Sequence, residues 1–202
     1  MQSQVFVGKP APDFTAKAVM PDNSIESEFN LRHYIKGHRC ILFFYPLNFT
    51  FVCPSEIIAF NNRLSEFDKR DTKVIAVSVD SQFSHLAWKN TEYNKGGIGN
   101  IQIPMVSDLN KEISQLYNVL NEDGVSLRGT FFIDSNFTTR HILVNDLSIG
   151  RNVDEALRVI DAYEYHLING EVCPAGWQKG DKGIFQSRDG IGDYLTSHGH
   201  KL

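Results

Sequence analysis

The sequence predicts an α/β fold in which a central mixed sheet is flanked by helices. Two short apolar, partly β-branched runs, 41–45 and 74–79, suit buried strands. The segment between them, 55–70, repeats apolar side chains at spacings of three and four, as one face of a helix does. Because a strand, a helix and a second strand in this order require a crossover, helices are expected on the faces of the sheet.

The remaining elements follow in chain order. A weaker helix is predicted over 84–93, and the apolar residues of 113–120 have helical spacing. Two more strand-like runs, 130–133 and 142–144, are separated by an Asp-Ser-Asn turn, which predicts a hairpin and makes the sheet mixed. A long amphipathic helix is predicted over 152–167.

The character of the chain changes after residue 170. Residues 171–202 hold six of the 15 glycines and show little apolar periodicity. We therefore predict one domain over 1–170 and an extended C-terminal arm over 171–202, rather than a second folded domain.

Composition and charge exclude several classes of protein. The chain has 42% hydrophobic and 22% charged residues and a net charge of -4, which is ordinary for a soluble globular protein and gives no basic footprint for nucleic acid. The N-terminus lacks the pattern of a secretory signal, and the longest apolar run, 40–46, is too short to span a bilayer. The expected location is cytoplasmic, with no membrane partner.

Three cysteines lie far apart in the sequence, at Cys40, Cys53 and Cys173. Their odd number argues against a secreted disulfide framework, and no C-x-x-C pair is present. Cys40 begins an apolar strand, so we interpret it as a buried structural thiol. The chemistry must then involve the other two cysteines singly, or together in three dimensions.

Cys53 lies where a strand, a short loop and a helix meet, in the run FYPLNFTFVCPSE of residues 44–56. Pro54 suits the first helical position, which predicts Cys53 at the N-cap and Glu56 at the third position. The free backbone N–H groups and the positive dipole end there favour a thiolate over a thiol. A thiolate can attack a peroxide oxygen and become a sulfenic acid, although a lone cysteine is more commonly a small core residue.

The residues around Cys53 carry a family resemblance. The pattern Pro46-x-x-x-Thr50-x-x-Cys53 resembles the peroxidatic signature of peroxiredoxins, and the full run is similar to that of the typical two-cysteine group, which includes alkyl hydroperoxide reductase C and the thiol-specific antioxidants. The similarity extends over about residues 7–183. Other matching blocks are Leu127-Arg128-Gly129, Gly150-Arg151-x-Val-Asp-Glu-Ala-Leu157 and Gly170-Glu-Val-Cys173-Pro-Ala-Gly-Trp177.

The resemblance implies a thioredoxin-like fold and a role for each matching residue. It makes Cys53 the peroxidatic nucleophile, and Thr50 and Arg128 its hydrogen-bond partners. Pro46 shields the pocket from water. In a supporting role, Glu56 and Arg151 hold Arg128 in place.

The same resemblance implies the partners. Cys173 becomes the resolving cysteine, which forms a disulfide with Cys53 of a second subunit in a homodimer. Dimers are expected to assemble into a decamer, and thioredoxin or a similar dithiol is expected to recycle the enzyme. The resemblance requires no cofactor and no metal.

Three alternatives remain beside a thiol peroxidase. A redox-regulated holdase chaperone or a peroxide-signalling relay would use the same chain for binding, and no sequence feature separates it from the enzyme. A cysteine hydrolase needs a histidine base beside Cys53, and none of the seven histidines lies in a recognisable motif. The absence of C-x-x-C argues against a disulfide isomerase.

Overall fold

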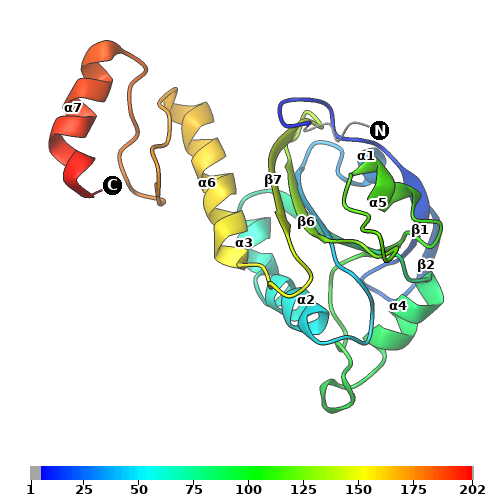
Figure 1. The fold of residues 1–202 in the computed structure, drawn as a ribbon. Helices are drawn as coiled ribbons and strands as arrows, with labels where there is room; N and C mark the ends of the chain where they lie inside the picture. The colour runs from blue at the N-terminus through cyan, green and yellow to red at the C-terminus, as the bar shows by residue number, and fades with distance from the viewer. Residues whose placement is uncertain (1–5, 202) are drawn as a thin grey trace. The chain divides into compact units, whose positions relative to one another are not determined.

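The computed structural model describes residues 6–201, and the chain divides into two compact units, Met1–Val153 and Asp154–Leu202. The first unit contains the sheet and all but two of the described α-helices (Figure 1). The predicted arm, 171–202, lies in the second unit. Because a division by packing does not test a division by sequence character, the boundary at residue 170 stays a prediction.

A seven-stranded mixed sheet forms the centre of the first unit, in the order β2-β1-β5-β4-β3-β6-β7. The strands β3, β4 and β5 pair in parallel, and the remaining pairings are antiparallel. This confirms the predicted mixed sheet. The strands are β1 Thr15–Val19, β2 Ile25–Asn30, β3 Arg39–Phe44, β4 Thr72–Ser78, β5 Met105–Ser107, β6 Arg128–Ile133 and β7 Thr139–Asn145.

Helices connect and cover the strands. In the first unit these are α1 Leu31–Tyr34, α2 Val52–Asn62, α3 Leu64–Asp68, α4 Gln82–Lys89, the short 3-10 helix Tyr93–Lys95 and α5 Glu112–Leu116. The predicted helix over 55–70 is thus two helices. The chain leaves helical geometry at Arg63, whose backbone has φ -108° and ψ 10°.

Strand β3 shows why both faces of the sheet are covered. Successive side chains of a strand point to opposite faces. Leu42 and Phe44 join the core that contains Tyr117, next to α5, whereas Phe43 stacks on Phe60 of α2 with ring centroids 4.5 Å apart. Figure 1 accordingly shows α2 and α5 on opposite sides of the sheet.

Three strands were not predicted from the sequence, namely β1, β2 and β5. They are three to six residues long, and most of β2 is exposed, so none has a long apolar or strictly alternating run. The predicted 113–120 helix is also shorter, because α5 ends at Leu116 and Leu120 pairs with Ser126 in an isolated bridge.

The second unit contains α6 Val153–Asn169, with the exception of its first residue, a bridge between Val172 and Ile184, α7 Arg188–His198 and the 3-10 helix Gly199–Lys201. The predicted arm is therefore not extended throughout. Ser187 caps α7 by accepting a hydrogen bond from the Gly190 backbone at 3.0 Å. Two glycines within α7 weaken its helix propensity, which explains why the sequence pattern did not indicate it.

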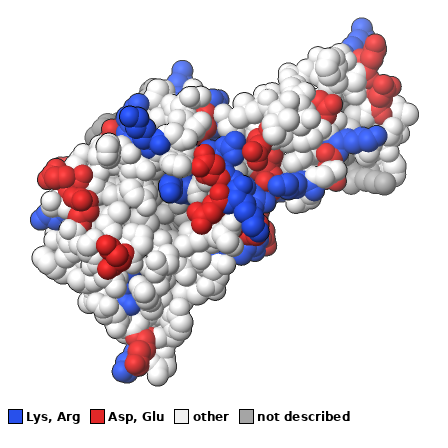
Figure 2. All heavy atoms as spheres, turned by 180° about the vertical axis from the view of Figure 1, so that it is seen from behind, with Lys and Arg blue, Asp and Glu red and all other residues white. Residues whose placement is uncertain are grey.

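Charges are mixed on the face that Figure 2 shows, where Lys and Arg lie among Asp and Glu. That face has no large area of one sign. Among the described residues, no helix combines the length and the apolar character that crossing a membrane requires.

Cys40 is buried as the sequence predicts, with 0% of its surface exposed, and burial raises the pKa of its thiol. We expect Cys40 to react with a thiol-labelling reagent far more slowly than Cys173 in the folded, reduced protein, because both accessibility and thiolate content are low. Timed labelling followed by peptide mass spectrometry measures both sites, and denatured protein serves as the control. Equal labelling rates in the folded protein would contradict this placement.

Candidate active site

The thiol of Cys53 is placed by β3, by the loop that follows it and by α2. The helix begins at Val52, with Phe51 at the N-cap position, so Cys53 is the second helical residue and the predicted N-cap assignment is wrong. The reason is that the backbone of Phe51 already has helical angles, φ -106° and ψ -54°. Cys53 still lies in the first turn, where backbone N–H groups lack partners within the helix.

Arg128, the first residue of β6, faces this thiol. Its Nη1 donates to Cys53 Sγ at 3.5 Å, and the exposed fractions are 3% for Arg128 and 1% for Cys53. Nε and Nη2 of the same guanidinium both donate to the carbonyl oxygen of Leu147, at 2.9 and 2.6 Å. The planar group is thus held along one edge while its other edge meets the sulfur.

Glu56 lies one turn further along α2 and accepts from both arginines of the site. Its Oε2 is 2.7 Å from Arg128 Nη1 and 2.9 Å from Arg151 Nη2. Burial alone would raise the pKa of the Glu56 carboxyl, but the hydrogen bonds and charge of Arg151, with the charge of Arg128, lower it. Glu56 is therefore a buried carboxylate shared by two cations.

Arg151 completes the cluster. Its backbone N–H and Nε donate to Glu56 Oε1 at 2.8 and 2.9 Å, and its Nη1 donates to the carbonyl oxygens of Phe44 and Gly129, each at 2.8 Å. Only 1% of the side chain is exposed, and burial lowers its pKa against the opposing effect of Glu56. Arg151 joins the ends of β3 and β6 to α2.

The other two predicted residues of this region lie in the preceding loop. Pro46 is buried two residues after the end of β3, and its role in excluding water stays a prediction. Thr50 is half-buried, and its hydroxyl donates to the carbonyl oxygen of Leu47 at 2.9 Å. The hydroxyl hydrogen is thereby committed, whereas the oxygen can still accept a hydrogen bond.

Cys173 belongs to the second unit and is described within it. The thiol is partly buried, and its Sγ donates to the carbonyl oxygen of Ala162 at 3.3 Å. Burial raises the pKa of this thiol, while the charge of Arg158 opposes the rise. The pairing of Cys173 with Cys53 stays a prediction.

Sequence reasoning missed the backbone acceptors of the site, among them the carbonyl oxygens of Leu147 and Gly129. A carbonyl oxygen has no residue-type signal, so only the fold can reveal these contacts. It also missed Asn48, a buried amide within an aromatic-rich loop. The sequence signal for this residue was a polar side chain between two apolar ones, Leu47 and Phe49, which the structure shows to be exposed.

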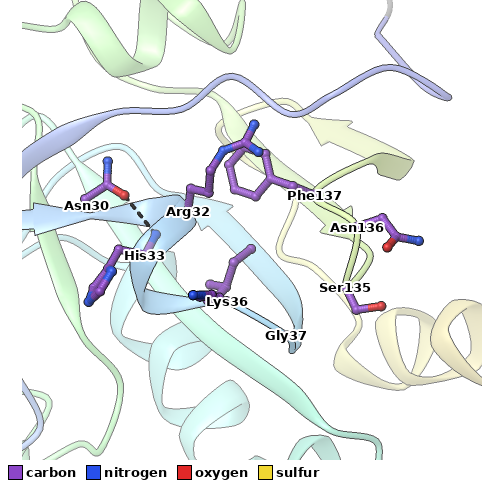
Figure 3. Close-up of a pocket in the computed structure, with 9 residues that line it drawn as sticks. Asn30, Arg32, His33, Lys36, Gly37, Ser135, Asn136 and Phe137 are labelled. Atoms are coloured by element: carbon purple, nitrogen blue, oxygen red, sulfur yellow. Dashed lines mark hydrogen bonds between the residues drawn. The ribbon is translucent and has the colours of Figure 1, made fainter.

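A separate cavity of about 430 Å³ lies between α1 and the β6–β7 turn (Figure 3). The Arg32 guanidinium lies over the Phe137 ring there, 4.0 Å from its centroid. Its lining contains no cysteine and none of the predicted site residues. A thiol reaction therefore cannot use this cavity as its centre.

Comparisons with known proteins identify the family of this chain. The AhpC/TSA family matches residues 7–142, and the C-terminal domain of 1-Cys peroxiredoxin matches residues 162–197. Alkyl hydroperoxide reductase C of Helicobacter pylori is 49% identical over 98% of this chain and 100% of its own length.

Solved structures extend the similarity to the fold. The reduced 2-Cys peroxiredoxin of Plasmodium vivax has a TM-score of 0.92 and 51% identity, over 96% of this chain and 100% of its own. Prx1a of Plasmodium yoelii, which forms an artifactual octamer when modified at the N-terminus, has a TM-score of 0.77 and 48% identity, over 87% of this chain and 100% of its own. This chain therefore belongs to the AhpC/TSA family and is an enzyme of the peroxiredoxin class.

Proposed function

We propose that this enzyme reduces hydrogen peroxide and organic hydroperoxides at Cys53, with Cys173 as the resolving thiol. The observation that carries the proposal is the contact of Cys53 Sγ with the held guanidinium of Arg128. A buried sulfur beside a fixed cation has the surroundings that a nucleophilic thiolate needs.

The first step transfers one oxygen atom to sulfur. The Cys53 thiolate attacks the terminal oxygen of the peroxide, the S–O bond forms, and the O–O bond breaks. The leaving alkoxide or hydroxide takes a proton and departs as alcohol or water, which leaves a sulfenic acid on Cys53. Negative charge spreads over sulfur and two oxygens in this step, and Arg128 is placed to stabilise it.

Thr50 and Pro46 complete the proposed peroxide site. Because the Thr50 hydroxyl donates to Leu47, its oxygen is available to accept the O–H of a bound peroxide. The buried ring of Pro46 has no N–H to offer a competing water molecule. Glu56 and Arg151 act through Arg128, whose orientation they fix.

The second step forms a disulfide. The Cys173 thiolate of the partner subunit attacks the Cys53 sulfenic sulfur, the S–S bond forms, and hydroxide leaves as water after protonation. Cys53 is only 1% exposed, so a second cysteine cannot reach its sulfur in the closed site. The loop before α2 and the first turn of the helix must therefore open to bring the Cα atoms within roughly 7 Å.

Recycling requires an external dithiol, for which thioredoxin or a similar protein is the proposed reductant. That dithiol becomes a disulfide as the Cys53–Cys173 bond returns to two thiols.

We place the peroxidase domain at 1–170 and the resolving arm at 171–202, in a homodimer that assembles into a decamer. A cytoplasmic location stays a prediction. A holdase chaperone or a signalling relay is not favoured, since the named relatives are peroxiredoxins and peroxide reductases.

Substitution of the two proposed reactive cysteines separates the two steps. Cys53→Ser should abolish peroxide consumption, because no sulfenic acid can form. Cys173→Ser should still consume one equivalent of peroxide and accumulate Cys53 sulfenic acid, which dimedone labelling and mass spectrometry detect. The proposal fails if Cys53→Ser retains the wild-type rate, or if oxidised wild-type protein lacks the Cys53–Cys173 disulfide.

Arg128→Lys should slow oxidation of Cys53 by about a hundredfold, as loss of one donor to a developing negative charge typically does. Lysine keeps the charge but lacks the planar fork that contacts Leu147, Glu56 and Cys53 together. Stopped-flow measurement of the second-order rate with hydrogen peroxide tests this. Arg140→Lys is the matched control, because Arg140 pairs with Asp134 near the β6–β7 turn. Equal rates for both variants would remove Arg128 from the mechanism.

Glu56→Gln should lower the free energy of unfolding by about 3–5 kcal/mol at neutral pH, because two buried guanidiniums lose their shared anion. The pKa of Glu56 is lower in the folded protein than in the unfolded chain. The contribution of Glu56 to the free energy of unfolding is therefore complete above the unfolded-state pKa and is lost as pH falls through the folded-state pKa. The difference between the two proteins in urea unfolding should therefore begin to shrink as pH falls below about 4. A difference that is constant from pH 7 to pH 3 would contradict this account.

A further inference from the structure

The loop of residues 46–50, here called the Pro46–Thr50 loop, joins β3 to the helix that carries Cys53. Two of its side chains, Leu47 and Phe49, are 37% and 51% exposed, and the centroid of the Phe49 ring lies 5.7 Å from that of Trp88 in α4. Asn48, between Leu47 and Phe49, is 6% exposed. A buried amide between two exposed side chains requires partners, and these partners help to hold the loop closed.

Asn48 contacts three segments outside the Pro46–Thr50 loop. Its Oδ1 accepts from the Tyr45 hydroxyl at 2.8 Å, and its Nδ2 donates to Ser84 Oγ at 2.9 Å and lies 3.1 Å from His85 Nδ1. Its backbone N–H donates to Asp80 Oδ2 at 2.9 Å. Ser84 and His85 belong to α4, so these contacts, which we call the Asn48 latch, attach the loop to that helix.

The direction of each hydrogen bond in the latch follows from His85. Its Nε2 lies 3.2 Å from the carbonyl oxygen of Val106, which can only accept, so Nε2 carries the hydrogen. Burial lowers the pKa of His85 to about 4, although Asp80 opposes this, so the ring is neutral at physiological pH. Its Nδ1 is then an acceptor for Asn48 Nδ2. Both amide hydrogens and the amide oxygen thus have complementary partners.

This complementarity is specific to an amide. An aspartate would keep the acceptor for Tyr45 but would lose both donors, which leaves His85 Nδ1 and Ser84 Oγ without them. An alanine would remove the 2.8 Å acceptor of the buried Tyr45 hydroxyl and the donor to His85 Nδ1, and would leave these two groups, which lie 3.3 Å apart, with only each other as partners in place of the amide.

We propose that Asn48 is a positioning residue that latches the Pro46–Thr50 loop to α4. The latch holds Cys53 in its closed position against Arg128, and its release controls how readily the loop opens for the disulfide. The inference rests on the proposed reaction at Cys53. It does not add a group to the chemistry, because no contact joins the Asn48 side chain to the sulfur among the interactions described for these residues.

Amide hydrogen exchange of the reduced, full-length protein tests the latch without any catalysis. In Asn48→Ala, exchange in residues 46–53 should rise by about tenfold or more relative to wild type, because buried hydrogen bonds that oppose opening are lost. Ser84→Ala removes one acceptor from the α4 side and should give a smaller rise in the same segment. Asn61→Ala is the matched control, because Asn61 accepts from Gln102 and has no part in the latch.

Unchanged exchange in residues 46–53 of both latch variants would overturn the proposal. A rise spread evenly over the sheet would also overturn it, since it would show a general loss of stability. If Asn48→Ala fails to fold, Ser84→Ala alone decides, because its change is confined to one hydroxyl.

A chemical measurement follows the consequence for the site. The sulfenic acid of Cys53 either meets Cys173 to give a disulfide and water, or meets a second peroxide to give a sulfinic acid and an alcohol or water. Easier opening should slow the first oxidation and lower the sulfinic share at a fixed peroxide dose in Asn48→Ala. An unchanged or higher sulfinic share would contradict the latch. If wild-type Cys53 reacts with peroxide no faster than Cys40, the proposed function fails. The hydrogen-exchange experiment still tests the latch in that case, because it involves no catalysis.

Discussion

The carboxylate of Glu56 is the contact on which the rest of the site depends. It accepts hydrogen bonds from Arg128 and Arg151, which are both buried, and each arginine also donates to backbone carbonyls of other segments. The cluster therefore ties α2 to β6 and to the segment after β7. The cluster contains two cations and one anion, so a thiolate at Cys53 would bring the number of negative charges to that of the positive charges. The same cluster that ties these segments together would therefore also stabilise the proposed nucleophile.

The same packing creates a conflict between protection and access. A sulfur that is 1% exposed can be reached by a small peroxide after slight movement, but not by a cysteine on another chain. In the proposed reaction, the site must remain closed for the first step and must open for the second. The segment from Pro46 to Cys53 can serve both needs only if its attachment is weaker than that of Glu56, one turn further along the helix.

Sequence reasoning located the candidate site residues but not the contacts that organise them. Cys53, Glu56 and Arg128 were identified through a local run and a family resemblance, and the structure brings these three together. The helix start was placed two positions too late, because proline is tolerated in the first turn and Phe51 adopts helical angles. The carbonyl of Leu147 and the helix α7 have no residue-type signal, since one is backbone and the other contains two glycines.

The two attachments of the Pro46–Cys53 segment and its helix differ in kind. Glu56 is held by charge-assisted hydrogen bonds within a buried cluster, where loss of a partner leaves an uncompensated ion. The Asn48 side chain is held by neutral hydrogen bonds, which water can replace once the loop is exposed, and its backbone N–H donates to the carboxylate of Asp80. Opening should therefore begin at the loop and stop before Glu56. The Arg128 cluster then stays assembled while the sulfur moves out, and closing restores the contact between Arg128 and Cys53 without refolding the helix.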